Sequence, residues 1–326
     1  MSNLQVGFIG AGGNARGHMG RVAEIEGATI AAVCDVDGAR AAEAAQEHGA
    51  RVYVDHMEML DAETLDALYI SVPPCAHTDA EIEAAGRGIH LFVEKPVHLS
   101  MDAALRICEA IDEAGIITCV GYQLRYLDPT QKLKQWLSGK TIGLVATTRW
   151  GGLPGTPWWR VMEESGGQLV EQTTHQIDLM RYFAGEVVEV SARYALRTMG
   201  DVEDFGIPDA QALWMRFASG ALGTCTTSCM AVEGGSKGDL DVLLKSQRVG
   251  WAADRVTSSP EVAELSGPYA ETPNIDRVFL DAVRSGSQRK ILSSYLDGVR
   301  TLDVTLTANR SAERDGEPLP TRLGGR

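Results

Sequence analysis

Lys95 is the first residue whose type and position could do chemistry. It follows the apolar run Leu91-Phe92-Val93, and Pro96 ends the strand because proline has no N–H to donate to a sheet. A run without a polar face is typical of a parallel strand that is covered on both sides. The pattern therefore places Lys95 at the carboxyl rim of an open α/β sheet, where such folds hold their ligands. A solvated lysine after a strand is the alternative.

A second candidate group lies in a helix predicted over residues 167–184. Glu171 and His175 are four residues apart and share one helix face, and Asp178 borders that face. A carboxylate one turn from a histidine can orient the imidazole and raise its basicity, which suits a general acid or base near neutral pH. A solvated charged face is the alternative, but the neighbouring residues are apolar or uncharged. The glycine pair 166–167 would let a ligand approach the helix start closely.

Aromatic and hydrogen-bonding residues close to these groups could hold a substrate. Trp158 stands near Arg160 in a loop, where an indole could stack on a polyol or sugar ring. Packing in the core or at a subunit interface is an equal alternative for Trp158 and Trp159. We expect Lys95, His175 and Glu171 to be catalytic. The residues expected to contact substrate are Lys95, Tyr122, Gln123, Arg125, Trp158, Arg160, Glu171, Gln172 and His175.

A dinucleotide-binding pattern opens the chain. A strand predicted over residues 4–9 runs into the loop Gly10-Ala11-Gly12-Gly13-Asn14-Ala15. A helix is expected over about 14–26, and a second strand over 29–34 ends at Asp35. A glycine motif alone is weak evidence, but strand, glycines, helix, strand and acid in register indicate a Rossmann fold.

Each position of this loop has a physical role. Gly10 permits the tight turn, Gly12 lets the backbone approach a pyrophosphate, and the small Ala15 lets the helix pack on its strand. The amino terminus of the helix attracts the phosphates. His18 is interpreted as a helix residue only. The residues expected to contact the cofactor are Gly10, Gly12, Gly13, Asn14, Ala15, Asp35, Arg40, Ser71, Pro73, His77, Glu94 and Lys95.

The cofactor is predicted to be NAD rather than NADP. A carboxylate at Asp35 would bond the adenosine ribose hydroxyls and would repel a 2′-phosphate, and no arginine follows it directly. Arg40 keeps NADP open as the alternative. His77, at a helix entry, could touch the nicotinamide ribose or equally make a local cap.

Alternating strands and helices position these residues as far as residue 121. Right-handed crossovers between them would give a doubly wound parallel sheet. Further strands are expected near residue 52 and over 65–71, 90–93 and 116–120, and helices over 37–48, 77–86 and 100–115.

The remainder of the chain changes character. Long strand-like runs indicate an open, mainly antiparallel sheet, which makes residues 122–326 an α+β substrate-binding and oligomerisation domain beside an NAD(P)-binding Rossmann domain over 1–121. The carboxyl-terminal helix is expected to pack back towards the Rossmann domain. The predicted strands cover 142–150, 187–196, 211–217, 221–230 and 239–244, and the helices start at 128 and cover 167–184, 274–285 and 295–314.

Composition limits the possible partners. The chain has 326 residues and a formal net charge of −14, which disfavours nucleic acid and anionic membranes as partners. Six scattered cysteines without a C-x-x-C pair favour buried free thiols in a reducing cytoplasm over disulfides or a metal site. We expect no signal peptide, no membrane span and no metal.

Together these residues resemble the glucose–fructose oxidoreductase / inositol dehydrogenase / MocA-type (Gfo/Idh/MocA) family over nearly the whole chain. The resemblance rests on the glycine loop, Asp35, Glu94-Lys95-Pro96, Gly121-Tyr122 with Arg125, Gly166-Gly167 with Glu171, His175 and Asp178, and residues 307–312. It implies an amino-terminal Rossmann domain and an open-sheet domain whose face forms dimers or tetramers. It also implies that Lys95 hydrogen-bonds the reacting hydroxyl and that His175 is the acid or base. Two departures are Ala15, where a third glycine is commoner, and Glu171, where many members carry Asp.

Three functions follow as hypotheses. The favoured one is an NAD(P)-dependent dehydrogenase that moves a hydride between nicotinamide C4 and a secondary hydroxyl carbon of a sugar, inositol or related polyol. The second is a lyase or glycosidase that oxidises its substrate transiently with bound NAD. The third is a non-enzymatic dinucleotide sensor, against which the presence of both Lys95 and His175 argues, since a sensor needs neither.

Overall fold

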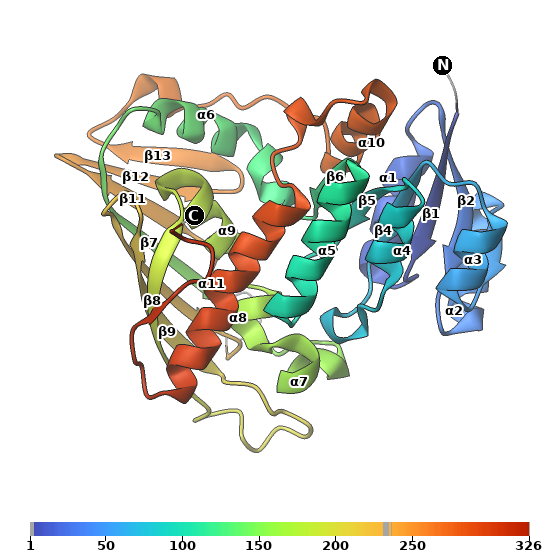
Figure 1. Cartoon of the computed structure of the whole chain (residues 1–326). Helices are drawn as coiled ribbons and strands as arrows, with labels where there is room; N and C mark the ends of the chain where they lie inside the picture. The colour runs from blue at the N-terminus through green and yellow to red at the C-terminus, as the bar shows by residue number, and fades with distance from the viewer. Residues whose placement is uncertain (1–2, 231–234, 236, 326) are drawn as a thin grey trace. The chain divides into compact units, whose positions relative to one another are not determined.

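The computed structural model describes residues 3–230, 235 and 237–325, and the chain divides into two compact units (Figure 1). The first unit contains residues 1–121 and 273–299, and the second contains 122–272 and 300–326. Residues 273–299, which the sequence placed in the second domain, therefore group with the first. The chain passes between the units for the last time inside helix α11 (Tyr295–Glu313), after Val299.

Parallel strands form the sheet of the first unit, in the order β3-β2-β1-β4-β5-β6 across its described residues. Every pairing is parallel, and β1 lies between β2 and β4, so the predicted Rossmann topology is confirmed. The strands are β1 (Leu4–Ile9), β2 (Ala28–Cys34), β3 (Arg51–Tyr53), β4 (Ala67–Ile70), β5 (His90–Val93) and β6 (Thr118–Val120).

Helices connect these strands, and some of them begin or end at caps that the sequence provides. Asp37 accepts hydrogen bonds from the second and third N–H groups of α2, and Ser100 caps α5, which Gly115 ends in the left-handed conformation. The sequence did not predict α3. The helices are α1 (Gly13–Ala23), α2 (Gly38–His48), α3 (His56–Ala62), α4 (Ala80–Gly86), α5 (Met101–Ala114) and α10 (Ile275–Ser285).

A row of aromatic rings explains why α10 belongs to this unit. Phe8, Tyr69 and Phe92 stack across β1, β4 and β5 with ring centroids 4.7 and 4.6 Å apart. Phe279 on α10 packs edge-on against Tyr69 and Phe92 at 5.6 and 5.7 Å. All four side chains are buried, so α10 covers apolar area that the sheet would otherwise expose to water.

The second unit is built on a large open sheet in the order β13-β12-β11-β7-β10-β9-β8-β14 over the part of the chain that the structure describes. Only β7 and β10 pair in parallel among these strands, so the predicted mainly antiparallel sheet is confirmed. The strands are β7 (Ile142–Trp150), β8 (Val187–Ala195), β9 (Ala210–Phe217), β10 (Leu222–Ser228), β11 (Leu240–Leu244), β12 (Gln247–Ala252), β13 (Arg255–Ser259) and β14 (Leu319–Pro320).

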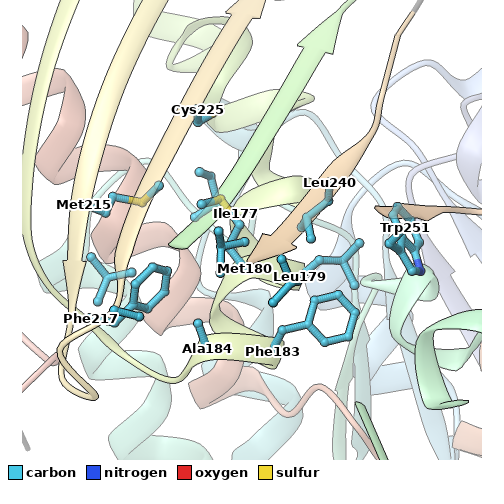
Figure 2. Packing of buried hydrophobic residues seen from close by; sticks show 14 of the residues in the cluster. Ile177, Leu179, Met180, Phe183, Ala184, Met215, Phe217, Cys225, Leu240 and Trp251 are labelled. Carbon is cyan, nitrogen blue, oxygen red and sulfur yellow. The ribbon is translucent and has the colours of Figure 1, made fainter. Parts of the chain in front are cut away.

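One face of this sheet is covered by helices, and the core lies between them. Figure 2 shows Ile177, Met180 and Phe183 of α9 in the buried cluster that also contains Met215 and Phe217 of the sheet. Alternation on β9 sends every second side chain into this core and the others to the opposite face. The helices are α6 (Asp128–Leu137), α7 (Met162–Ser165), α8 (Gly167–Glu171), α9 (Thr174–Ala184) and the part of α11 after Val299.

The single helix predicted over residues 167–184 is wrong. The structure has two helices, α8 and α9, separated at Gln172 and Thr173. The Thr173 N–H donates to the Gln168 carbonyl at 3.0 Å, five residues back, which is outside the α-helical pattern. The Thr173 hydroxyl lies 2.6 Å from the hydroxyl of Thr227 on β10. A contact with the sheet thus holds the chain in the break.

Two further features bear on the sequence predictions. No helix among the described residues is long and apolar enough to cross a membrane. None of the six cysteines, all of which the structure describes, is in a disulfide, but Cys75 is exposed and Cys108 is only partly buried, so the prediction that all the thiols are buried is wrong for these two.

Candidate active site

The glycine loop between β1 and α1 has the geometry of a phosphate cradle. Gly10 has φ = +93°, and a Cβ at this position would lie 2.3 Å from the carbonyl oxygen of Ser71, so only glycine fits. At Gly12 and Gly13 an added Cβ would meet nothing within 4 Å, which leaves open space at the start of α1. Ala15 is fully buried, as expected for a helix that packs closely on its strand.

Asp35 follows β2 at the same rim. One carboxylate oxygen accepts a hydrogen bond from the Ala11 N–H at 2.8 Å, and the other accepts from the Asp37 N–H at 2.9 Å. Arg40 lies 3.2 Å from Asp35 and 3.6 Å from Asp37, with nearly half of its side chain exposed. The carboxylate is therefore held against the glycine loop, with a cation beside it.

We expect Asp35→Ala to weaken NAD binding and to relax discrimination against NADP. The variant removes the ribose acceptor and the negative charge that opposes a 2′-phosphate. A hydrogen bond to a charged group is worth about 1.5–3 kcal/mol, or roughly 10- to 100-fold in Kd. Fluorescence titration with NADH and NADPH measures both effects. Asp37→Asn is the matched control, because it removes a neighbouring charge and keeps the cap of α2. An unchanged NAD preference in Asp35→Ala would contradict the assignment.

The remaining predicted cofactor residues lie on or close to the carboxyl rim of the first sheet. Ser71 and Pro73 follow β4, Glu94 and Lys95 follow β5, and Asn14 is exposed in the first turn of α1. The hydrogen bond from the Glu94 N–H to the Ile70 carbonyl continues the ladder beyond the strand end at 2.8 Å. Lys95 thus lies at the same edge of the sheet as the glycine loop.

His77 makes a local contact with the helix that follows it. Its Nδ1 lies 2.5 Å from a carboxylate oxygen of Glu81 in α4, and both side chains are almost fully buried. This geometry favours the local pairing over a contact with the nicotinamide ribose.

These residues fit a bound dinucleotide. The open space at Gly12 and Gly13 admits a pyrophosphate against the amino terminus of α1, and the Asp35 carboxylate is the acceptor that ribose hydroxyls need. When bound, the nicotinamide ring supplies the hydride acceptor. Among the described residues, no group of three His, Cys, Asp or Glu side chains could hold a metal ion.

The second unit carries the predicted acid or base, His175, near the start of α9. The ring of Tyr122 stands at 89° to the His175 imidazole with centroids 5.9 Å apart. The Tyr122 hydroxyl lies 2.9 Å from the Thr174 hydroxyl. Burial raises the pKa of Tyr122 above its ordinary value, so this phenol stays protonated. Tyr122 thus contacts two residues of the first turn of α9, Thr174 and His175.

Glu171 is the last residue of α8, so it does not share a continuous helix face with His175. Both side chains are buried, with residue exposures of 7% and 8%. Gln172 lies in the break between the helices and is half-buried. The prediction that Glu171 and His175 share one continuous helix face is therefore wrong, and the catalytic role of Glu171 stays a prediction.

Arg125 and Asp178 form a buried ion pair. The Arg125 Nε and Nη2 atoms each donate to one oxygen of the Asp178 carboxylate at 2.7 Å, and both side chains are at most 4% exposed. Arg181 lies 3.8 Å from the same carboxylate, and the Thr301 hydroxyl donates to it at 3.1 Å. Two nitrogens of the Arg125 guanidinium are therefore bonded to Asp178. This pairing suits a positioning role for Arg125 better than the predicted substrate contact.

Trp158 and Arg160 line a cavity of about 560 Å³ in the second unit. Trp158 stacks on Trp159 with centroids 6.3 Å apart, and the Arg160 Nε donates to the Pro154 carbonyl. Neither indole is fully buried. Gln123, the last of the predicted substrate residues, is exposed.

Sequence reasoning missed one cluster, around His18. The side chain of this residue is buried between two carboxylates, those of Glu94 and Asp276. The signal available in the sequence was a histidine on the buried side of α1. Asp276 is 258 residues away, and nothing local connects it to α1.

Comparison with known families decides the relationship. Residues 4–122 match the family model described as "Oxidoreductase family, NAD-binding Rossmann fold", and residues 130–243 match the GFO/IDH/MocA C-terminal domain. A myo-inositol 2-dehydrogenase of Thermotoga maritima is 30% identical over 237 residues, which cover 71% of this chain and 70% of the relative. The chain belongs to the Gfo/Idh/MocA family of oxidoreductases.

Relatives within the family extend over most of the chain. A scyllo-inositol 2-dehydrogenase (NAD(+)) of Bacillus subtilis is 27% identical over 314 residues, which cover 91% of this chain and 90% of the relative. The match includes both units, so the predicted family membership is confirmed for more than the Rossmann domain alone.

Solved structures of Gfo/Idh/MocA type share the fold. The WlbA dehydrogenase from Bordetella pertussis, in complex with NADH and UDP-GlcNAcA, superposes with a TM-score of 0.84 at 23% identity, covering 98% of this chain and 99% of the other. Levoglucosan dehydrogenase, in complex with NADH and levoglucosan, gives 0.84 at 19% identity, covering 99% and 100%. The first unit of this Gfo/Idh/MocA protein is an NAD-binding domain, and the predicted NAD cofactor is confirmed.

Proposed function

We propose that this protein is an NAD-dependent dehydrogenase that oxidises a secondary hydroxyl group of an inositol, a sugar or a related polyol. The relatives support this substrate class, because two of them are named inositol 2-dehydrogenases and one of these matches over 91% of the chain. The proposed catalytic residues are Lys95 and His175, with Glu171 as a further candidate.

One observation carries the proposal: Asp35 and Lys95 follow strands on opposite sides of β1. The strand order β3-β2-β1-β4-β5-β6 puts Asp35 after β2 and Lys95 after β5. Asp35 would hold the adenosine ribose of a dinucleotide, and the glycine loop would hold its pyrophosphate. Lys95, beyond β4 on the other side of β1, is then the residue whose ammonium group could donate to a substrate hydroxyl.

In the proposed reaction the secondary alcohol becomes a ketone, and bound NAD would supply the hydride acceptor. His175 is proposed to accept the proton of the substrate hydroxyl. Lys95 is proposed to donate a hydrogen bond to a substrate oxygen and to stabilise the charge that develops there. The His175 proton leaves to solvent after turnover. Proton transfer of this kind contributes about 10²- to 10⁴-fold, and stabilisation of the oxyanion adds a comparable factor.

A substrate screen tests the proposal. Purified protein with NAD is incubated with inositols, aldoses, sugar acids and anhydrosugars, and the reduced cofactor is followed by its absorbance. We expect stoichiometric NADH and ketone with at least one member of the set. Binding of NAD without turnover of any compound would favour the dinucleotide sensor instead.

The transient-oxidation alternative has a distinct signature. In that case the substrate is cleaved or loses a group while NADH does not accumulate, because the hydride returns to the product. Product analysis beside the absorbance measurement separates the two reactions. Relatives named as dehydrogenases support net oxidation as the first choice.

We further propose that the exposed face of the second sheet joins two copies of this chain. Leu222, Leu144 and Leu243 face one another across β10, β7 and β11 in direct register. Leu222 and Leu243 are 51% and 37% exposed, and Trp214 on β9 is 39% exposed. An apolar row on a flat sheet face pairs well with its own copy about a twofold axis, as homodimer interfaces do.

We expect Leu222→Asp to shift the protein towards the monomer. An aspartate in this row would have to be desolvated in the interface. Sedimentation velocity at micromolar concentration measures the shift. The control is Val54→Asp, which places the same charge on an exposed aliphatic position of the first unit. Equal sedimentation of Leu222→Asp and the unmodified protein as dimers or tetramers would contradict this interface.

The compartment is proposed to be the cytoplasm. The six free cysteines, four of them buried, suit a reducing environment.

A further inference from the structure

Four charged side chains meet inside the first unit, on three elements far apart in sequence. His18 and Arg21 belong to α1, Glu94 follows β5, and Asp276 lies in the first turn of α10. The His18 Nδ1 lies 2.5 Å from an oxygen of Asp276, and its Nε2 lies 2.9 Å from an oxygen of Glu94. The second oxygen of Asp276 accepts from the Arg21 Nε at 2.5 Å.

The imidazolium form of His18 satisfies both carboxylate contacts at once. A neutral imidazole has one N–H, so one of its nitrogens would face a carboxylate oxygen with lone pair against lone pair. Burial by itself would lower the pKa of His18, but the hydrogen bonds to Asp276 and Glu94 raise it to about 9. Burial would raise the pKa of Asp276, but the contacts with His18 and Arg21 hold it below its ordinary value. The cation therefore stands between two anions.

The other groups around the ring fit this state. Arg21 also lies 2.9 Å from the His18 Nδ1, but its side chain is 40% exposed and shares Asp276, which offsets the like charge. The ring packs against Phe92 and Tyr69 at centroid distances of 4.7 and 5.6 Å. Burial raises the pKa of Tyr69 well above its ordinary value, so this residue is a neutral neighbour.

Glu94 connects the cluster to the residue proposed for catalysis. Its other oxygen accepts from the backbone N–H of Lys95 at 3.1 Å. A Cβ added at Gly121 would lie 2.4 Å from the Glu94 carboxylate, so the chain after β6 closes tightly over this side chain. The Glu94 carboxylate thus has His18 on one oxygen and the Lys95 backbone on the other.

We propose that His18 is a positioning residue that holds Glu94, and through Glu94 the backbone of Lys95, in the geometry needed for hydride transfer. This inference rests on the proposed function, because it assigns His18 a part in the same reaction. Asp276 of α10 holds the other nitrogen of the His18 ring. Misplacement of a catalytic group by about 1 Å can cost roughly 10²-fold in rate.

The test compares His18→Gln with the matched control His48→Gln, which changes a partly exposed histidine at the end of α2. In His18→Gln both carboxylates lose the imidazolium, and Asp276 keeps its contact with Arg21. We expect kcat to fall about 10- to 100-fold at pH 7.5 with less than a threefold change in the Kd for NADH. The double variant His18→Gln/Glu94→Gln should recover at least fivefold of the loss, since no unpaired carboxylate remains. His48→Gln should behave as the unmodified protein.

A second readout does not depend on turnover. The rate at which acetic anhydride acylates Lys95 in the NAD complex, measured by mass spectrometry against Lys132 in the same sample, should change at least threefold in His18→Gln and not in His48→Gln. If no polyol is oxidised by the unmodified protein, the proposed function fails, and this labelling ratio still decides the positioning role. An unchanged labelling ratio in His18→Gln would overturn it, whether or not kcat changes.

The pH dependence gives the sign of the effect. The pKa of His18 is raised from about 6.5 to about 9, so its stabilising contacts are complete below the lower value and are lost as pH rises through the upper one. The Tm of the unmodified holoenzyme should therefore fall more between pH 8 and 9.5 than that of His18→Gln. If His18→Gln does not fold, Asp276→Asn keeps the hydrogen bond, lowers the pKa of His18 and should move the alkaline limb of kcat towards neutral pH. An alkaline limb that stays in place in that variant would overturn the proposal.

Discussion

Lys95→Ala is expected to remove most of the turnover while leaving the affinity for NAD nearly intact. Lys95 follows β5 at the rim that carries the cradle of Gly12 and Gly13, on the side of β1 opposite Asp35. Its ammonium group would act on the substrate oxygen, where charge develops only during the reaction. Removing such a donor costs about 10²- to 10³-fold in kcat.

The measurement combines steady-state turnover of the polyol found in the screen with NADH titration. Lys290→Ala is the matched control, because Lys290 is an exposed lysine in the same unit. A kcat equal to that of the unmodified protein would eliminate Lys95 as a catalytic residue. A large rise in the Kd for NADH with an unchanged kcat would make it a cofactor ligand only.

The second large effect is expected on stability, from Asp178→Ala. This variant leaves the guanidinium of Arg125 buried without the carboxylate that engages two of its nitrogens, and it removes a neighbour of Arg181, which keeps Glu186 at 2.9 Å. Breaking a buried pair from one side costs about 3–5 kcal/mol of unfolding free energy. We therefore expect a clear fall in the urea midpoint of the second unit.

The distribution of tryptophan makes this measurement specific. All six tryptophans lie in the second unit, so their fluorescence follows its unfolding. The control is Asp241→Ala, which breaks a pair with Arg248 whose side chains are 32% and 65% exposed. Exposed pairs contribute up to about 1 kcal/mol, so this midpoint should move little. Equal midpoints for the two variants would show that the buried pair does not stabilise the fold.

The roles of these two residues could be anticipated to different degrees. The position of Lys95 at the rim of the sheet could be predicted from the local sequence. An apolar run that is followed by Glu94-Lys95-Pro96 is typical of a buried strand that ends there. Arg125 and Asp178 were both noticed in the sequence, but their pairing joins residues 53 positions apart. The sequence around Arg125 does not distinguish an arginine in a buried ion pair from one that binds a substrate.

Elements with strong local patterns were predicted well, and those formed by distant contacts were not. β12 and β13 carry glycine, arginine and serine and become strands by pairing at the edge of a sheet that already exists. The break between α8 and α9 depends on the contact of Thr173 with Thr227. Residues 273–299 belong to the first unit because Phe279 packs against the rings of Tyr69 and Phe92.

The sequence by itself determined the Rossmann domain, its cofactor and the rim that holds Lys95. Gly10, Ala15 and Asp35 each meet a steric or electrostatic need that neighbouring residues in the chain already define. The tertiary structure alone decided the charge state of His18, the partner of Arg125 and the two-helix form of the segment around His175. Each of these features depends on a contact with a residue more than about 50 positions away in the sequence. The burial and distance of such groups set the local electrostatics, and a short window of sequence does not contain them.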